Sequence, residues 1–282
     1  MPLMLATRYD QPGNVSLEGI PTNSDGGMNE AAALTRFVKQ SVELAELQEL
    51  LFAAGTHGLL VVLQGRDASG KDGTIRGVGG AMNPAGTRVV AFKVPTPHER
   101  AHDFLWRVHK ETPGLGEAVF FNRSHYEDVL VVRVHNLVPD PVWKRRYDDI
   151  VAFEELLAEA NVIVVKFFLH ISKNEQEKRL LAREADSTKA WKLNASDWQD
   201  RPLWEKYTEA YEDVIEKTAV RHAPWYVIPA DRKWFRNVAL SEVLLDTLRP
   251  YKAGWKTTLD TLGAKQREAL TQLRATLNDT PK

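Results

Sequence analysis

The sequence has 282 residues and 43% apolar composition, enough for one large α/β domain or two small ones around a buried core. Its 37 Lys and Arg against 38 Asp and Glu leave a formal charge of −1, so no overall field attracts nucleic acid or acidic membranes, and we expect neither as a partner. The absence of cysteine excludes disulfides and thiolate metal sites, and the N-terminus lacks a long apolar run, so we expect a cytoplasmic protein.

The first predicted elements are an irregular arm and a helix. Residues 1–28 are rich in Gly, Pro, Asn and Ser, and we expect no packed element there. From residue 29 onward, apolar residues recur at helical spacing as far as Gly55, a typical helix end. Residues 29–282 contain no internal repeat and no break in composition, so a single domain is predicted.

Five apolar runs of strand length follow, at residues 58–65, 87–94, 118–124, 161–172 and 223–230. Their continuous hydrophobicity suits strands that are buried on both faces of a parallel sheet. Helical patterns lie between the runs. Alternation of strand and helix with right-handed crossovers predicts a doubly wound α/β fold, with ligands at the carboxyl ends of the strands.

A phosphate-binding loop is predicted directly after the first run. Gly65, Gly70 and Lys71 satisfy the pattern G-x-x-x-x-G-K between an apolar run and a segment compatible with a helix. In such a loop the backbone N–H groups and the next helix N-terminus face an anion, and the lysine reaches the outer phosphates. The alternative is a Gly-rich turn with a solvated lysine.

Two aspartates in this loop bear on metal binding. Asp72 stands where a phosphate-binding loop usually has a magnesium-binding Ser or Thr, and Asp67 places a carboxylate inside the predicted loop. A carboxylate there would repel phosphate unless a metal ion lay between them. Magnesium binds through one or two carboxylates plus substrate phosphates, so Asp67 is predicted to be a metal ligand. Asp72 is expected to cap the following helix or to support the loop.

The pattern G-x-D-x-x-G-K-x-G, which ends at Gly73, resembles the family of type-2 polyphosphate kinases. Two further stretches match the family in the right order, FNRSHYEDVLVVRVH at residues 121–135 and a lid-like stretch at 171–215. The resemblance implies a P-loop kinase-like three-layer sandwich, in which a parallel five-stranded sheet is flanked by helices. It also implies a helical lid at about residues 173–210, called the lid segment below.

The resemblance implies an enzyme that uses Mg²⁺ or Mn²⁺ to transfer the terminal phosphoryl group of inorganic polyphosphate to AMP and ADP, giving ADP and ATP. Asn122 occupies the usual position of the family's Walker B aspartate, and N-R-S-x-Y-E-D resembles the subgroup that phosphorylates both nucleoside mono- and diphosphates. Asparagine supplies no negative charge. We therefore expect Asp128 or Glu127 to help Asp67 hold the metal, with the choice between them left open.

Cations are also needed, because phosphoryl transfer depends on positioning and on neutralisation of charge. The predicted catalytic residues are Asp67, Lys71, Arg123, Asp128 and Arg183. The predicted phosphate- or nucleotide-binding residues are Gly65, Ala68, Ser69, Gly70, Gly73, Lys93, Asn122, Arg133 and Arg179. Without the resemblance, Arg179 and Arg183 would be assigned to a solvated helix with local ion pairs.

Two alternative functions remain. An ATP-dependent nucleoside monophosphate kinase would share the fold and the loop, but Asp67 within the loop disfavours it. A non-catalytic nucleotide-sensing module would keep the loop without turnover, and the density of charged residues around the loop disfavours it. We also expect a homo-oligomer, either a dimer or a tetramer.

Overall fold

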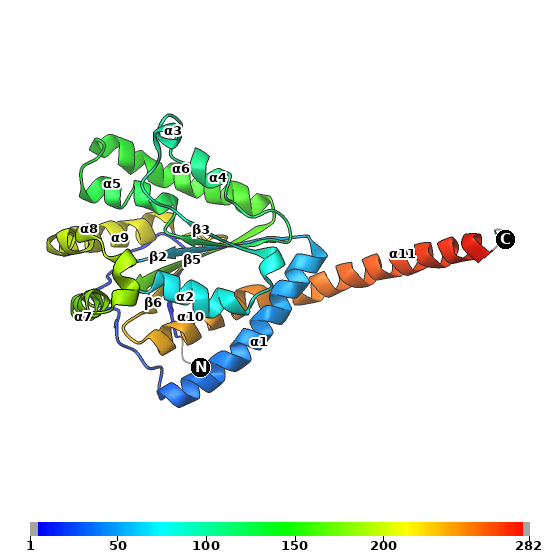
Figure 1. Ribbon diagram of the computed structural model, residues 1–282. Helices are drawn as coiled ribbons and strands as arrows, with labels where there is room; N and C mark the ends of the chain where they lie inside the picture. The colour runs from blue at the N-terminus through cyan, green and yellow to red at the C-terminus, as the bar shows by residue number, and fades with distance from the viewer. Residues whose placement is uncertain (1–4, 279–282) are drawn as a thin grey trace.

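The computed structural model describes residues 5–278 and is built on a single six-stranded sheet (Figure 1). The strands are β1 (Thr7–Tyr9), β2 (Gly58–Gln64), β3 (Thr87–Ala91), β4 (Ala118–Asn122), β5 (Val162–His170) and β6 (Trp225–Pro229). They lie in the order β1-β6-β5-β2-β4-β3. Strands β2 to β6 are parallel, which confirms the five predicted strands, and β1 pairs antiparallel with β6.

The sixth strand corrects the expectation for the N-terminal arm. Arg8 of β1 lies opposite Tyr226 of β6, and the side chains of Leu5 and Leu17, on either side of the strand, are buried. A three-residue strand is too short to produce a recognisable alternation of apolar and polar residues. The arm therefore covers one edge of the sheet and adds apolar side chains to the core.

Helices cover both faces of the sheet and complete the predicted three-layer sandwich (Figure 1). One face is covered by α1 (Glu30–Ala54), α2 (Lys71–Val78) and α10 (Lys233–Leu248), and the other by α6 (Asp140–Glu159) and α9 (Trp204–Thr218). Side chains of β2 alternate between two cores: Leu59, Val61 and Leu63 join the first, and Leu60 and Val62 the second. Because both faces of β2 are buried, the strand is apolar at nearly every position.

The remaining helices are short or lie at the rim of the sandwich. The α-helices are α3 (Pro97–Arg100), α4 (Trp106–His109), α5 (Val131–Val134), α7 (Lys173–Glu184), α8 (Ala195–Gln199) and α11 (Lys252–Asn278). The 3-10 helices are η1 (Gly79–Ala81), η2 (Pro84–Gly86), η3 (His125–Asp128), η4 (Ser187–Lys192), η5 (Arg201–Leu203) and η6 (Arg249–Tyr251). The lid segment thus contains α7, η4, α8, η5 and the start of α9.

The C-terminal helix α11 extends away from the body of the molecule (Figure 1). Its base is anchored by Trp255, which is buried in the first core, whereas Leu262 and Leu270 further along are about half exposed. None of the helices in the described residues combines the length and the apolar content needed to cross a bilayer.

The strand order brings two loops together at the carboxyl edge of the sheet. Strand β2 lies between β5 and β4, and Leu63 near its end is paired with Asn122, the last residue of β4. The segments that follow β2 and β4 are therefore neighbours, at the position where doubly wound folds bind ligands.

Candidate active site

The loop after β2 has a backbone that requires glycine at two positions. Gly65 and Gly70 have φ values of 150° and 105°, in the region that favours glycine. A Cβ atom on Gly65 would lie 2.8 Å from Oγ of Ser69, and one on Gly70 would lie 1.9 Å from Nη1 of Arg236. Ala68 adopts a left-handed φ of 60° despite its side chain, and such strain is concentrated at functional sites. The chain then enters α2 at Lys71.

Lys71 lies inside this phosphate loop. Its Nζ donates to the carbonyl oxygens of Gly65 at 2.6 Å and Arg66 at 3.2 Å, and the residue is 8% exposed. Burial, together with the positive charge of Arg123, lowers the pKa of Lys71 to about 8. A phosphate anion in the loop would favour the protonated lysine, because an opposite charge at close range favours the charged form.

Arg123 connects the phosphate loop to the segment that follows β4. Its guanidinium pairs with Asp67 and, at 3.2 Å, with Oε2 of Glu127. The negative charge of Glu127 raises the pKa of Arg123, with burial opposing it and Asp67 adding to it. Two carboxylates and one permanently charged guanidinium are therefore gathered at the carboxyl edge of β2 and β4.

Glu127 is fixed in this cluster by Gln64, the last residue of β2. With its amide oriented to satisfy both neighbours, Gln64 donates to Oε1 of Glu127 at 3.0 Å and accepts from the hydroxyl of Ser124 at 3.1 Å. Gln64 and Ser124 are fully buried. The position of the Glu127 carboxylate is therefore set by the last residue of β2, which is itself held by the N-cap residue of η3.

Asp128 has different partners. Nη1 of Arg146 donates to its backbone carbonyl at 2.9 Å and to its carboxylate at 3.3 Å, and Arg107 lies 3.9 Å from the same side chain. Burial raises the pKa of Asp128 although both arginines oppose this shift. The sequence left open whether Asp128 or Glu127 helps Asp67 to hold a metal. Of these two, Glu127 pairs with Arg123, which also pairs with Asp67.

Asp72 joins the phosphate loop to β4 and to the lid segment. Nδ2 of Asn122 donates to Oδ1 of Asp72 at 2.7 Å, and Lys192 of η4 pairs with Oδ2. Burial acts against ionisation, but the hydrogen bonds from Lys192 and Asn122 lower the pKa of Asp72. No side chain caps the N-terminus of α2, so the capping interpretation of Asp72 is wrong, and the side chain supports the loop instead.

Arg179 of α7 braces the phosphate loop. Nη1 donates to the carbonyl oxygens of Ala68 at 3.0 Å and Ser69 at 3.2 Å, and Nη2 donates to those of Ala230 at 2.8 Å and Asp231 at 2.7 Å. Its Nε donates to Glu175 at 2.8 Å. Every guanidinium nitrogen of Arg179 thus has a protein partner, so its direct role here is to hold the loop against the segment after β6.

The other predicted residues are distributed around this centre. Arg183 pairs with Asp197 at 2.8 Å inside the lid segment, and Arg133 pairs with Asp213 of α9 at 2.5 Å. Lys93 is exposed just beyond β3. Gly73 lies in the first turn of α2, and the buried hydroxyl of Ser69 has no hydrogen-bond partner in the described part of the chain. The structure thus brings the loop residues, Asn122, Arg123 and Glu127 together, and gives Arg133 and Arg183 partners outside the loop.

Three aromatic residues of α9 were missed by the sequence reasoning. Trp204, Tyr207 and Tyr211 line a small cavity together with Asp67 and Arg123. The guanidinium of Arg66 stacks over Trp204, with 3.7 Å between its Cζ atom and the ring centroid. The aromatic residues recur at helical spacing, a signal that could have placed them on one face of a helix.

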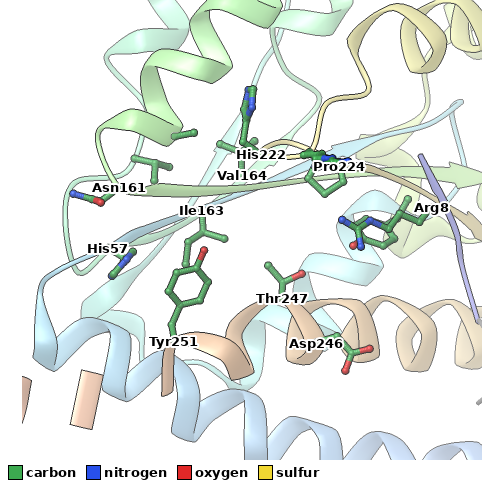
Figure 2. A pocket seen from close by; sticks show the side chains of 14 residues that line it. Arg8, His57, Asn161, Ile163, Val164, His222, Pro224, Asp246, Thr247 and Tyr251 are labelled. Atoms are coloured by element: carbon green, nitrogen blue, oxygen red, sulfur yellow. The ribbon is translucent and has the colours of Figure 1, made fainter. Parts of the chain in front are cut away.

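A second cavity, of about 530 Å³, lies at the amino-terminal ends of the parallel strands, opposite the phosphate loop (Figure 2). Ile163 and Val164 in its wall belong to the beginning of β5, and Tyr251 and His57 lie across from them. The phosphate loop follows the end of a neighbouring parallel strand. None of the predicted site residues lines this cavity.

The carboxylates of the site suit a hard divalent cation whose coordination is completed by the phosphates of a bound substrate and by water. Within residues 5–278, no group of three or more His, Asp or Glu side chains could hold a metal ion unaided. Asp67 and Glu127 supply two carboxylates beside the phosphate loop. Magnesium is typically bound through one or two carboxylates, phosphate oxygens and water, which fits this donor set.

Comparison with known proteins agrees with this geometry. The family model described as Polyphosphate kinase 2 matches residues 28–254. The AMP/ADP-polyphosphate phosphotransferase of Meiothermus ruber is 54% identical over 224 residues, covering 79% of this chain and 83% of that protein. The ADP-polyphosphate phosphotransferase of Rhodopseudomonas palustris is 38% identical, covering 96% of each chain. The crystal structure of Polyphosphate Kinase 2 from Arthrobacter aurescens TC1 superimposes with a TM-score of 0.81 at 43% identity, covering 84% of this chain and 86% of that one.

Proposed function

We propose that this chain, which belongs to the polyphosphate kinase 2 family, transfers the terminal phosphoryl group of inorganic polyphosphate to AMP and to ADP. The products are ADP and ATP, respectively, and a polyphosphate chain shorter by one phosphate. The observation that carries the proposal is the cluster of Asp67, Arg123 and Glu127 beside the phosphate loop. The name of the Meiothermus ruber relative supports both acceptors.

The reaction is a direct displacement at phosphorus. An oxygen of the acceptor phosphate attacks the terminal phosphorus of polyphosphate, and the bond from that phosphorus to the bridging oxygen breaks. No general base is needed, because phosphate oxygens are already ionised at neutral pH. Lys71 and Arg123 neutralise the oxygens of the transferred group, which is the main catalytic requirement of phosphoryl transfer.

Asp67 and Glu127 would hold the divalent cation, Mg²⁺ or Mn²⁺, which supplies charge neutralisation to the phosphates when it is bound. Arg123, lying between the two carboxylates, holds them in place before any cation enters. We propose that Arg183 contributes to phosphate binding from the lid segment. Its ion pair with Asp197 holds the side chain within that segment. Exclusion of water by the lid prevents hydrolysis of the donor.

Product analysis tests this function. Purified protein, polyphosphate, magnesium and AMP, without ATP, are expected to give ADP first and then ATP. An ATP-dependent nucleoside monophosphate kinase would make ADP only when ATP is supplied, and a nucleotide-sensing module would make no product with either donor. Cytoplasmic location, a homo-oligomeric state, and the absence of nucleic-acid and membrane partners stay predictions.

The two neighbouring carboxylates of η3 are expected to respond differently to neutral substitution. Glu127→Gln removes a charge beside Asp67 and should raise the magnesium midpoint and lower turnover by about tenfold or more, since a metal contact stabilises developing charge by several kcal/mol. Asp128→Asn should leave the magnesium midpoint near that of wild type, because Asp128 faces Arg107 and Arg146.

The measurement is a magnesium titration of turnover with AMP and with ADP, using Asp67→Asn as the reference for loss of a ligand. A shift of the midpoint in Asp128→Asn but not in Glu127→Gln would reverse the assignment.

A further inference from the structure

A buried cluster of polar side chains lies beneath η3 and has no role in the reaction described so far. Its centre is Glu154 of α6, whose Oε2 atom lies 2.5 Å from Nζ of Lys166 on β5. The other carboxylate oxygen, Oε1, accepts a hydrogen bond from the hydroxyl of Tyr126 at 2.8 Å and lies 3.3 Å from Nε2 of His125. All four residues, called the anchor cluster below, are fully buried. Two consecutive side chains of η3 are thus anchored on one carboxylate oxygen.

The hydrogen bonds of the anchor cluster are nearly complete. The three donors of the lysine ammonium group meet a Glu154 oxygen, the Tyr126 hydroxyl at 3.0 Å and the Thr218 carbonyl at 2.7 Å. Of the buried side-chain atoms of the cluster, Nδ1 of His125 alone lacks a partner within residues 5–278. A buried polar network that is satisfied to this degree is rigid and holds its members in one arrangement.

Stability alone does not account for a buried ion pair at this place. Taking two charges out of water is costly, and apolar residues of similar volume often give the same or a higher stability. The anchor cluster supplies something that apolar residues lack, namely hydrogen bonds with a fixed direction. Two of these contacts end on η3, through Tyr126 and His125. The segment whose position the cluster specifies is therefore η3.

The proposed metal ligand Glu127 follows directly after the two anchored residues. Its carboxylate reaches Gln64 and Arg123 beside the phosphate loop. Because η3 is a short 3-10 helix of four residues, the backbone position of Glu127 depends on that of the residues just before it. A displacement of about 1 Å in a catalytic group can lower the rate about 10²-fold. The anchoring of η3 thus bears on the chemistry although the cluster is remote from the phosphates.

We propose that Glu154 is a positioning residue for the divalent cation site. Held by Lys166, it fixes η3 through the Tyr126 hydroxyl and the His125 ring, and so sets the position of the Glu127 carboxylate. This inference rests on the proposed function and adds to it a group that acts without touching substrate. The competing explanation is that the anchor cluster only stabilises the core between α6 and the sheet.

Tyr126→Phe is the first test, because it removes one hydroxyl and keeps the ring and the ion pair in place. In the metal-free protein, the backbone amides of η3 should exchange with deuterium about fivefold faster, whereas those of β5 keep the wild-type rate. With polyphosphate and AMP, the magnesium midpoint should rise about threefold and kcat should fall about fivefold, while the KM for AMP stays near wild type. Faster exchange across β5 as well, with an unchanged magnesium midpoint, would establish the purely structural explanation.

Ile150→Val is the matched control for a general loss of stability. Ile150 is fully buried on α6, one helical turn before Glu154, and belongs to the core that contains Tyr126. Shortening it by one methyl group should lower the unfolding temperature without removing a hydrogen bond of the anchor cluster. The magnesium midpoint and the exchange rates of η3 should therefore stay at the wild-type values. Equal changes in Ile150→Val and Tyr126→Phe would show that the cluster acts through stability alone, and would overturn the proposal.

The double variant Glu154→Leu with Lys166→Met separates positioning from stability more sharply. The free energy of unfolding should stay close to wild type, because both charges are replaced together by apolar side chains. Tyr126 and His125 nevertheless lose their shared anchor. Exchange of the η3 amides and the magnesium midpoint should therefore rise at least as far as in Tyr126→Phe. A stable double variant with wild-type exchange and a wild-type midpoint would contradict the positioning role.

The proposed function and the positioning role fail in different ways. Wild-type protein that makes no ADP from polyphosphate and AMP would refute the proposed function, while the exchange rates of the metal-free protein would still show whether the anchor cluster fixes η3. An active wild type whose magnesium midpoint is unchanged in Tyr126→Phe and in the double variant would refute only the positioning role.

Discussion

Replacement of Lys71 by alanine is expected to lower turnover by about 10²- to 10³-fold or more, because a positioned charge that faces the transferred group is removed. The side chain lies inside the phosphate loop, where its contacts are the carbonyl oxygens of Gly65 and Arg66. Initial rates with polyphosphate and AMP measure the loss, and an unchanged circular dichroism spectrum shows that the fold is kept. Turnover close to wild type would mean that the loop does not hold the transferred phosphate.

The same lysine predicts the sign of a pH dependence. The pKa of Lys71 in the free enzyme is lowered to about 8, chiefly by burial, so the side chain is protonated below this pH and loses its charge above it. The value of kcat/KM for polyphosphate should therefore be constant below pH 8 and decline as the pH rises through that value. Lys71→Arg keeps the charge at higher pH, so any activity that it retains should lack this decline. A decline that is equally present in Lys71→Arg would assign the titration to another group.

Replacement of Lys166 by methionine is expected to lower the free energy of unfolding by about 3–5 kcal/mol, because it leaves a buried carboxylate without its counter-ion. Nζ of Lys166 lies 2.5 Å from Oε2 of Glu154, and both residues are fully buried. Lys166 also donates to the hydroxyl of Tyr126 at 3.0 Å and to the carbonyl of Thr218 at 2.7 Å. Burial disfavours ionisation of Glu154, but the charge of Lys166 and a hydrogen bond from His125 keep its pKa below the usual value.

The matched control is the double variant Glu154→Leu with Lys166→Met, which removes both charges. Since replacing a whole buried ion pair with apolar residues is often close to neutral, the double variant should be more stable than Lys166→Met alone. The free energy of unfolding in urea is measured for the wild type, Glu154→Leu, Lys166→Met and the double variant, which completes a double-mutant cycle. Additive losses would show that the two side chains do not stabilise each other.

The local signals in the sequence were sufficient for the central layer of the fold and for the phosphate loop. Four strands, β2, β4, β5 and β6, could be predicted because a strand buried on both faces needs a continuous apolar run. The edge strand β3 is only partly buried and was predicted from its apolar run alone. The spacing of Gly65, Gly70 and Lys71 likewise depends on neighbouring residues alone. Both features are set within a few residues of chain, so no knowledge of distant partners was required.

The features that escaped prediction depend on contacts between distant segments. Glu127 and Asp128 are adjacent in a 3-10 helix, and they are distinguished by the contact of Arg123, the partner of Glu127, with Asp67 and by the contact of Asp128 with Arg146. Lys166 interrupts an apolar strand, and its partner Glu154 is on a different element. The contact between Arg236 and the phosphate loop is likewise invisible until α10 is packed against α2.

The antiparallel pairing of β1 with β6 also constrains the order in which the fold can be completed. Thr7 lies opposite Val227, so the first strand of the chain has its partner near the end of the domain. A pairing with such a large sequence separation must wait for the intervening loops to close, and contacts of this kind slow folding. During synthesis from the N-terminus, β1 can join the sheet only after β6 has emerged and packed beside β5. A strand that is made before all five parallel strands is therefore among the last to reach its final place, at the edge of the sheet formed by β6.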